Sequence, residues 1–498
     1  MKKMLALLLA CLMLCPLFAA CGKDTPAQSG EMTTASTEAT KDPDAPDLPS
    51  PEELGDLSGD FNILVSGNYA RNDFAADGTE GTAVQTAIYR RNERIREKYN
   101  VNVTNEDVIA FNSATGGGTG FTKLYTEYMS GEVTYDAAQI GTYDVATLAY
   151  SGYIEDLNTI EHLDLTKPYW DQKANADLSI NGKMYYTTGD ITIIDNMVTN
   201  AILFNKDMIK SYGLDNPYAL VEDGKWTLEN FGKMVKQVGD DLNQDGIYDE
   251  NDRYGLLTWN DAMLAILAAA GEKISTINES GQLELSFYSE RVVDLYSEFE
   301  DIVFDQAHAY NYQYDNVAGA GTPSAVWDTN RIKMFDSDQA LFYTTLLTTV
   351  DKHRNSETDF GILPFPKYDE NQADYGHAVS AFHCAFICVP ALSASPRVGV
   401  ILEELAYEGK QLLTPAYYDQ TLIGQYTRDE ESADMLDLIF ATRVYDVGIY
   451  YNIGEYKTQL GALYRTRSSL SSLYETYLNV ANKKIEQINT IFAMANEE

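Results

Sequence analysis

Residues 241–252 carry acidic and amide side chains at the spacing of a loop that can wrap a cation. Oxygen-bearing side chains stand at the first, third, fifth and ninth positions, and Gly246 stands at the sixth, where the loop must turn sharply. Calcium takes about six to eight hard oxygen ligands, so this spacing predicts a bound Ca²⁺. The predicted ligands are Asp241, Asn243, Asp245, the carbonyl group of Ile247, Asp249 and Asp252.

Two features separate this loop from the loop of a calcium sensor. The twelfth position carries Asp252, where a bidentate Glu is usual. Residues 253–259, which follow, have the pattern of a strand, whereas a sensor loop is followed by a helix. We therefore expect a structural ion. The alternative is an acidic turn that holds no ion.

The sequence lacks the common signatures of catalytic sites. It contains no His-Glu-x-x-His and no Gly-x-Ser-x-Gly, and its histidines are scattered without ligand spacing. The glycine-rich stretch 112–120 lacks the lysine of a phosphate-binding loop, which favours an ordinary loop. A pair of glycosidase carboxylates is left open, because 75 acidic residues offer many pairs and no spacing selects one.

The apolar run 381–390 holds Cys384 and Cys388 and predicts a buried strand. A spacing of four places both thiols on one strand face, about 13 Å apart, too far for a disulfide in a straight strand. We expect two buried free thiols. A metal pair involving His383 is the weaker alternative, because His383 and Cys384 point to opposite faces.

Composition excludes several classes of protein. With 45% hydrophobic and 11% aromatic residues, the 498-residue chain has material for real cores, so it is not mostly disordered. Its 75 acidic and 36 basic residues give a net charge of −39. Such a surface repels phosphate backbones and excludes nucleic acid as a partner, but it does not repel neutral sugars.

The N-terminus predicts secretion. Residues 1–20 combine two lysines with a long uncharged run and end in Ala19-Ala20, the order of a signal peptide. Cys21 follows as in a bacterial lipobox, although Phe18 stands where Leu is usual, so we expect Cys21 to carry lipid. Ordinary cleavage, with Cys21 unmodified, is the alternative. Residues 21–57 contain almost no large apolar residue and predict a flexible tether.

The remaining chain alternates strand and helix patterns, which predicts βαβ units and a mostly parallel sheet. Strands are expected at 61–67 and 135–140, and an amphipathic helix with Val84, Ile88 and Ile95 on one face is expected at 82–99. Further helices are expected at 119–130, 227–238, 261–270, 289–304, 398–410, 429–443 and 467–493.

Several stretches, in their order along the chain, resemble an extracellular solute-binding lipoprotein of an ATP-binding-cassette (ABC) importer, of the carbohydrate-type family 1. These stretches, which follow the lipobox and the tether, are residues 89–99, 135–141, 201–209, 226–231 and 359–366. The likeness extends to about residue 450, and residues 414–456 are the part that is hardest to place in the family.

The resemblance implies an α/β fold of two lobes joined by a hinge (the type II periplasmic-binding-protein fold), with C-terminal helices. Lobe 1 is expected to comprise residues 58–200 and 356–398, and lobe 2 residues 201–355 and 399–498. The implied function is non-catalytic. A lipid-anchored monomer on the extracellular face captures a mono- or oligosaccharide between the lobes and delivers it to the permease. A peptide, a polyamine or another solute is the first alternative, and a secreted glycan hydrolase is the second.

The resemblance also implies where the ligand binds. Loops after the carboxyl ends of strands face the space between the lobes, and aromatic rings there stack on sugars. Each aromatic candidate has ordinary core packing as its alternative, and Trp170 and Trp226 are expected to be structural. The expected ligand-binding residues are Asn68, Tyr69, Tyr143, Asp144, Asp195, Asn196, Trp259, Asn260 and Trp327.

Overall fold

The computed structural model describes residues 42–69, 73–109, 116–314, 324–426 and 429–494. The chain divides into two units, Met1–Pro43 and Asp44–Glu498, and the fold described below is that of the second unit. The predicted signal peptide and the predicted lipidation site at Cys21 lie outside the described residues. Within the described ranges, no helix has the length and hydrophobicity that crossing a membrane requires.

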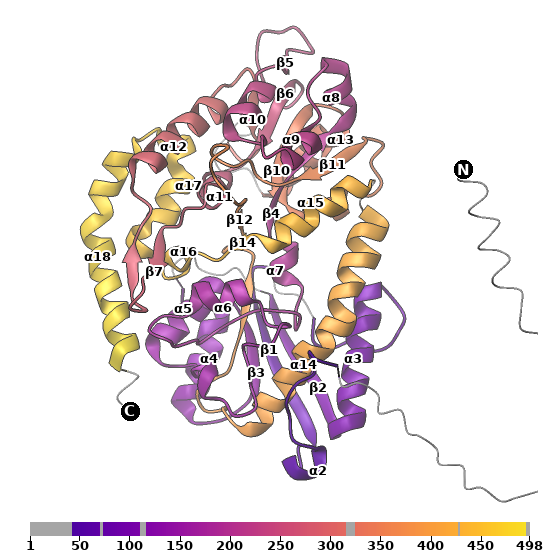
Figure 1. The fold of residues 1–498 in the computed structure, drawn as a ribbon, viewed down its shortest axis with the longest axis vertical. Coiled ribbons are helices and arrows are strands. Elements are labelled where there is room, and N and C mark those ends of the chain that lie inside the picture. The colour runs from indigo at the N-terminus through magenta and orange to yellow at the C-terminus, as the bar shows by residue number, and fades with distance from the viewer. Residues whose placement is uncertain (1–41, 70–72, 110–115, 315–323, 427–428, 495–498) are drawn as a thin grey trace, which may run out of the picture. The chain divides into compact units, whose positions relative to one another are not determined.

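The first sheet has the strand order β13–β3–β1–β2 and lies in the lower half of Figure 1. β1 runs parallel to β2 and β3, and β13 runs antiparallel to β3. The strands are β1 (Gly59–Gly67), β2 (Val101–Ile109), β3 (Ala137–Gly141) and β13 (Ala385–Cys388). The helices of this part are α2 (Pro51–Leu54), α3 (Ala83–Tyr99), α4 (Thr119–Ser130), α5 (Thr142–Ser151), η1 (Leu157–Thr159), α6 (Gln172–Leu178) and α7 (Ile194–Met197).

Helix α3 illustrates how local sequence builds this lobe. The Thr82 side chain accepts the backbone N–H of Gln85, and the Gln85 side chain accepts the N–H of Thr82, so the first turn is capped from both sides. Val84, Ile88 and Ile95 are buried, as their spacing predicts.

The second sheet has the order β11–β4–β10–β6–β5, with β9 paired to β6. β10 and β9 run parallel to β6, while β4 runs antiparallel to β10 and to β11. The strands are β4 (Asn200–Asn205), β5 (Gly239–Asp240), β6 (Arg253–Thr258), β9 (Ala309–Asn311), β10 (Ala340–Leu346) and β11 (Phe360–Leu363). The helices are α8 (Lys206–Tyr212), α9 (Pro217–Glu222), α10 (Leu228–Val235), α11 (Ala262–Ala269), α12 (Glu290–Val303), α13 (Ser324–Asp336) and η2 (Leu347–His353).

The C-terminal part adds helices to both lobes. α14 packs on α3, whereas α18 contacts α5, α12 and β8. The helices here are α14 (Pro396–Pro415), the π-helical η3 (Ala416–Tyr426), α15 (Glu430–Ala441), α16 (Val447–Tyr450), η4 (Ile453–Glu455), α17 (Tyr456–Thr466) and α18 (Leu470–Met494). The short strands form two further ladders, β7 (Ser275–Ile277) with β8 (Leu283–Leu285) and β12 (His377–Ala378) with β14 (Arg443–Val444).

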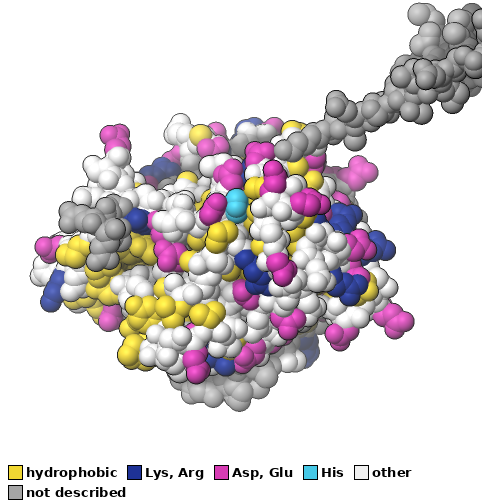
Figure 2. All heavy atoms as spheres, turned by 90° about the horizontal axis from the view of Figure 1, so that it is seen from below, with side chains coloured by type: hydrophobic (Ala, Val, Ile, Leu, Met, Phe, Trp, Pro, Cys, Tyr) yellow, Lys and Arg dark blue, Asp and Glu magenta, His cyan; other side chains and the backbone are white. Residues whose placement is uncertain are grey.

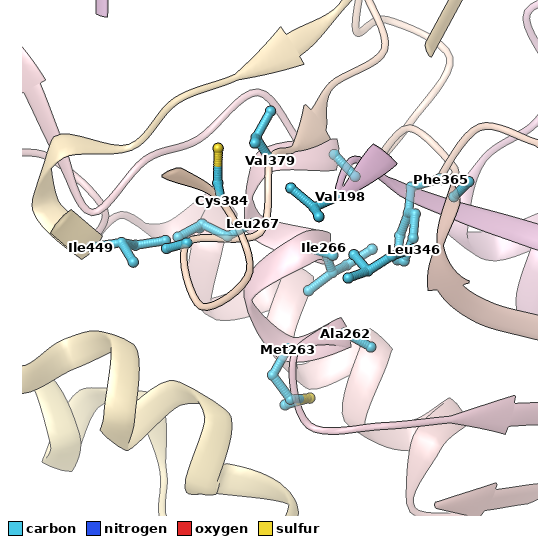
Figure 3. Packing of buried hydrophobic residues seen from close by; sticks show 14 of the residues in the cluster. Val198, Ala262, Met263, Ile266, Leu267, Leu346, Phe365, Val379, Cys384 and Ile449 are labelled. Carbon is cyan, nitrogen blue, oxygen red and sulfur yellow. The ribbon is translucent and has the colours of Figure 1, made fainter. Parts of the chain in front are cut away.

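A continuous hydrophobic core links the two sheets. Figure 3 shows side chains of α11 packed with Val198, Leu346 and Cys384, which come from distant parts of the sequence. A second cluster lies between the first sheet and α14 and contains Phe61 and Ile401. The predicted α/β, two-lobed class is confirmed, and Cys384 and Cys388 are both buried and free, as expected.

The structure assigns three segments differently from the expected boundaries. Residues 360–363, expected in lobe 1, form β11 and pair with β4 in the second sheet. Much of α14, expected in lobe 2, buries its apolar face with strands of the first sheet, because it follows β13 after a short turn. Leu57, expected in the tether, is buried, and Lys410 Nζ lies 2.7 Å from Asp44 Oδ2, so ordered chain begins before residue 58.

Acidic side chains are spread over the face of the molecule that Figure 2 shows. Figure 2, which views the molecule from below Figure 1, shows them scattered among neutral side chains and outnumbering the basic ones. This face shows no concentrated basic area of the kind that binds phosphate backbones.

Candidate ligand-binding site

The carboxyl ends of the parallel strands in the first sheet present one half of a candidate site. β1 ends at Gly67, and Asn68 and Tyr69 follow it. β13 begins beside the end of β3, so His383, which precedes β13, lies at the same edge. Asn68 Nδ2 donates a hydrogen bond of 2.7 Å to the carbonyl oxygen of Phe382, which ties the two loops together.

The second sheet presents the other half by the same rule. β6 and β9 run parallel and end at Thr258 and Asn311. Trp259 and Tyr312 follow directly, and their rings stack with centroids 6.3 Å apart and planes 18° apart. Trp259 and Tyr312 are each the first residue after a strand, and both rings are buried. The ends of two neighbouring strands therefore hold the two rings in place.

Aromatic rings from the two halves meet. The His383 ring lies 4.2 Å from the Tyr69 ring and 6.0 Å from the Trp259 ring, measured between centroids. We call Tyr69, Trp259, Tyr312 and His383 the aromatic cluster. Tyr69 is 50% exposed whereas Trp259 is 8% exposed, so the cluster runs from the surface to the interior.

His383 is a neutral ring within this cluster. Its Nδ1 lies 2.7 Å from the Ser380 hydroxyl, and burial, together with the positive charge of Arg331, lowers the pKa of His383 to about 3. The imidazole therefore carries no charge at physiological pH.

Arg331 and Asp328 form an ion pair beside the aromatic cluster, and their opposite charges offset each other. Arg331 lies 5.4 Å from the Tyr312 ring centroid, and its Nε donates to Asp328 Oδ1 at 2.7 Å. Burial works to raise the pKa of Asp328, but the hydrogen bond from Lys352 and the charge of Arg331 outweigh it and keep this pKa below its ordinary value. Burial, and then the charge of Asp328, raises the pKa of the Tyr69 hydroxyl.

Two polar side-chain atoms on the residues that follow β6 are buried and lack hydrogen-bond partners among the described residues. They are Trp259 Nε1, a donor, and Asn260 Oδ1, an acceptor. By contrast, Trp170 Nε1 donates to Glu403 and Trp226 Nε1 donates to the carbonyl of Pro364. An unmade buried hydrogen bond costs about 1–3 kcal/mol, so the atoms on Trp259 and Asn260 favour a ligand that supplies the missing partners.

The chain matches a family model over residues 75–380, more than half of its length, and this model describes the bacterial extracellular solute-binding proteins. The chain belongs to this family. The suspected family is therefore confirmed. No curated protein matches the sequence of the chain.

Solved structures similar to this solute-binding protein share its fold at low sequence identity. One is an ABC substrate-binding protein from Listeria monocytogenes in complex with cycloalternan, at 15% identity and TM-score 0.52, covering 88% of this chain and 99% of that one. Another is the galacto-N-biose-/lacto-N-biose I-binding protein from Bifidobacterium longum in complex with lacto-N-biose. It has 12% sequence identity and a TM-score of 0.56, and the match covers 87% of this chain and 98% of that one. A third is the GacH receptor of Streptomyces glaucescens. It has 13% sequence identity and a TM-score of 0.52, and the match covers 87% of this chain and 99% of that one.

Tyr143 does not belong to the aromatic cluster of this solute-binding protein; it lies with the charged side chains of Lys457 and Asp261. Lys457 Nζ lies 3.2 Å from the Tyr143 ring centroid, and burial lowers the pKa of Lys457 to about 7. Burial, and then the charge of Asp261, raises the pKa of Tyr143, while burial raises the pKa of Asp261 to about 6. Asp261 follows Asn260 in sequence, so this group adjoins the end of β6.

Other predicted ligand-binding residues make contacts within the protein. The Asp144 carboxylate accepts the backbone N–H groups of Gly118 and Phe121 and is buried. Asp195 and Asn196 both accept hydrogen bonds from Arg443. The side chain of Trp327 lies outside the described residues, although α13 includes its backbone.

The site also contains residues that the sequence did not identify: Tyr312, Arg331, Asp328, Asp261 and Lys457. Tyr312 directly follows a strand, as the expected ligand-binding residues do. The sequence did not identify it because β9 is too short to show a recognisable strand pattern. The sequence indicates His383 only as a candidate metal ligand, whereas the structure places its ring near those of Tyr69 and Trp259. Arg331 and Lys457 lie inside helices, and no local pattern marks them.

The predicted calcium loop forms the sharp turn that its sequence demands. Gly246 has φ +81°, and Asp241 Oδ2 accepts its N–H at 2.8 Å. Asp252 is fully buried, and its carboxylate accepts the N–H groups of Leu242 and Asp249. Within the described ranges, no three His, Cys, Asp or Glu side chains gather as metal ligands do. The donor atoms are of the right chemistry for calcium, and occupancy stays a prediction.

Proposed function

We propose that this solute-binding protein captures an uncharged carbohydrate at the facing edges of its two sheets. The observation that carries the proposal is the pair of unpartnered buried atoms, Trp259 Nε1 and Asn260 Oδ1, beside stacked aromatic rings. A sugar hydroxyl can accept from the first atom and donate to the second, while a pyranose face packs on the rings.

The charges around the aromatic cluster favour a neutral ligand. His383 is uncharged, and the charge of Arg331 is offset by Asp328 at hydrogen-bond distance. The Arg331 cation is therefore not available to a phosphate group, and the Asp328 carboxylate is not available to a polyamine, because each is paired with the other. Two of the similar proteins bind cycloalternan and lacto-N-biose, and the GacH receptor binds acarbose, which supports a sugar as the ligand class.

The proposed function also includes a location, at the outer face of the cell membrane. We propose that lipid on Cys21 holds it at the extracellular face of the membrane, and that it delivers the unmodified sugar to an ABC permease. Membership of the extracellular solute-binding family supports this location. The role is non-catalytic, so the sugar is expected to leave the protein unchanged.

The test is calorimetric titration and thermal shift of the purified protein against neutral oligosaccharides, amino acids, peptides and polyamines. A neutral sugar is expected to raise the melting temperature; at 100 times its Kd it adds about 2.7 kcal/mol of stability. Trp259→Phe keeps a ring but removes the indole N–H and is expected to weaken binding about fivefold, since a hydrogen bond contributes about 1 kcal/mol. Tyr288→Phe, at a residue that precedes α12 and whose ring stacks on Tyr474, is the control and is expected to bind normally.

Two results would overturn this function. A peptide or polyamine that binds while every neutral sugar fails would change the ligand class. Consumption of the sugar during the titration, detected by chromatography, would make the protein an enzyme.

A further inference from the structure

Residues 443–446, in the stretch that is hardest to place in the family, follow a helix of the second lobe. That helix, α15, packs on β11, and the hydroxyl of its Ser432 accepts the backbone N–H of Ile362 at 3.2 Å. Asp429, which caps α15, forms an ion pair with Lys206 of α8. Because α15 is attached to the second sheet in this way, the residues that follow it move with the second lobe.

Arg443 and Tyr445 bond to helices of the first lobe. Arg443 Nη2 lies 2.6 Å from Asp171 Oδ2, before α6, and Arg443 Nη1 lies 3.0 Å from Asp195 Oδ2 in α7. The Tyr445 hydroxyl donates to Asp171 at 2.8 Å, and the backbone N–H of Tyr445 donates to Asp177 at 3.2 Å. These contacts attach the end of a second-lobe helix to α6 and α7.

The next residue, Asp446, bonds in the opposite direction. Its carboxylate accepts the backbone N–H groups of Ile274 at 2.6 Å and Ser275 at 3.4 Å, in the segment that follows α11 of the second lobe. Asp446 is buried, so these bonds are shielded from water. One short segment therefore bonds to both lobes.

This segment lies where the chain passes between the two sheets. Figure 1 shows β12, β14 and α7 between them. β14 pairs with β12, and Val379, which follows β12, pairs with Thr199, which precedes β4. We call the segments that are paired here the joint, and they are residues 198–200, 377–380 and 442–445.

The angle between the lobes at the joint determines how the two halves of the candidate site face each other. The joint continues into His383 and β13 of the first sheet, and the His383 ring lies 4.2 Å from the Tyr69 ring. Trp259 belongs to the second sheet, and its ring centroid lies 6.0 Å from that of His383. A rotation at the joint changes the distance from His383 to Trp259, whereas the distance from His383 to Tyr69 lies within the first lobe.

The ion pair at the joint has capacity for a further hydrogen bond. Arg443 Nε and Asp195 Oδ1 are both buried and lack partners among the described residues. A guanidinium group can bind a carboxylate through two parallel hydrogen bonds, and here Asp195 receives only one from Arg443. The same two side chains therefore have a second arrangement, which a different angle between the lobes can provide.

We infer that Arg443 is a positioning residue for ligand capture. By attaching α15 of the second lobe to α6 and α7 of the first, it fixes the angle at which the two halves of the candidate site face each other. Only a planar fork can reach Asp171, Asp195 and Asn196 together, so lysine cannot replace it. The inference deepens the proposed function, because it concerns how the same site is assembled, but it does not require the ligand to be a sugar.

The experiment measures the distance between the lobes by double electron–electron resonance, without any ligand. Spin labels are attached at Met129→Cys in α4 and Lys233→Cys in α10, two exposed positions on different lobes. The cysteines at positions 11, 15 and 21 are replaced by serine, and Cys384 and Cys388 are buried.

We expect Arg443→Lys to widen the distance distribution of the labelled protein about twofold, because a lysine does not hold both carboxylates in one geometry. Arg397→Lys is the matched control. Arg397 also joins three segments, through Asp136 and the carbonyl groups of Leu57 and Asp60, but all three lie in the first lobe. This variant should leave the distribution unchanged.

A second variant decides the matter if Arg443→Lys does not fold. Tyr445→Phe removes only the hydroxyl that donates to Asp171 and Asp195, and it is expected to widen the distribution less than Arg443→Lys does. The inference is overturned if the folded variants at positions 443 and 445 both give the distribution of the parent protein. It is also overturned if Arg397→Lys widens the distribution equally. A failure of every sugar to bind would contradict the proposed function and leave this result unaffected.

Discussion

Arg443 joins segments of the chain that are far apart in sequence. Its Nη2 lies 2.6 Å from Asp171 Oδ2 before α6, and its Nη1 lies 3.0 Å from Asp195 Oδ2 in α7. The side chains of Asp171 and Asp195 are only 5% and 2% exposed, and the Tyr445 hydroxyl also donates to Asp171. Buried charges of this kind are stable only while every partner is present.

We predict that Arg443→Met lowers the free energy of unfolding by about 3–5 kcal/mol, because it leaves two carboxylates buried without their cation. Urea denaturation measures this loss. Lys225→Met, which breaks the exposed pair with Asp223, is the control and should cost less than about 1 kcal/mol. A loss below 1 kcal/mol for Arg443→Met would show that the buried pair contributes little.

At the residue scale, the sequence predicted the positions of side chains that follow strands better than the positions of side chains inside helices. Asn68, Tyr69, Trp259 and Asn260 follow strands, and the structure places them at the facing edges because strand ends share an edge. Asp195 also looked suitable by position, yet it bonds to Arg443, a partner that no local pattern connects with it.

The element with the clearest local chemistry is the loop 241–252. We predict that calcium raises the melting temperature of the purified protein and that a chelator reverses this rise. At a calcium concentration of 100 times the Kd, the free energy of unfolding should increase by about 2.7 kcal/mol. Asp241→Ala should abolish the calcium-dependent difference. Gln244→Gly changes a residue with φ +60° that supplies no predicted ligand, so the difference should remain.

The outcome that contradicts a calcium site is a melting temperature that is the same with calcium and with chelator. In that case the loop is an acidic turn held by its own hydrogen bonds, such as those from Leu242 and Asp249 to Asp252.

The segment before β1 gives a second prediction at this scale. Asp47 pairs with Lys167 at 2.9 Å, Leu48 and Leu54 pack on the core, and Arg397 Nε donates to the Leu57 carbonyl. A chain that begins at Asp44 should melt at the same temperature as the longer chain. A chain that begins at Ser58 should melt on the order of 5 °C lower, because it loses buried leucine surface. Equal melting of the two truncated chains in a calorimeter would show that residues 44–57 add nothing to stability.

For the whole molecule, buried carboxyl groups determine how stability changes with pH. Burial raises the pKa of Asp261 and Asp446 to about 6 and that of Glu403 to about 7. The folded state thus binds these protons more tightly than the unfolded state does. The resulting stability is fully present below the unfolded pKa values near 4 and is lost as pH rises through 6 to 7.

We therefore predict that the protein is more stable at pH 5 than at pH 8, and the repulsion within a net charge of −39 acts in the same direction. Each unit of raised pKa corresponds to about 1.4 kcal/mol. Urea denaturation at pH 5, 6, 7 and 8 measures the trend, and Glu403→Gln should flatten it, whereas Glu408→Gln, near the surface on the same helix, should not. Higher stability at pH 8 than at pH 5 would contradict the prediction.

The sequence by itself determined what depends on neighbouring residues. Apolar periodicity predicted helices such as α3 and α12, and the Asp/Asn/Gly spacing predicted the turn at Gly246, because these features involve residues a few positions apart. The order of the family-like stretches predicted the two lobes.

Only the tertiary structure decided which side chains meet. The contact of His383 with Trp259, the pairing of β11 with the second sheet and the packing of α14 on the first all join residues that are distant in the chain. Two buried surfaces attract each other without regard to their sequence separation, so local patterns cannot specify the partner. The unpartnered atoms on Trp259 and Asn260 are visible for the same reason: a missing contact can be recognised only when all the other contacts in the described chain are known.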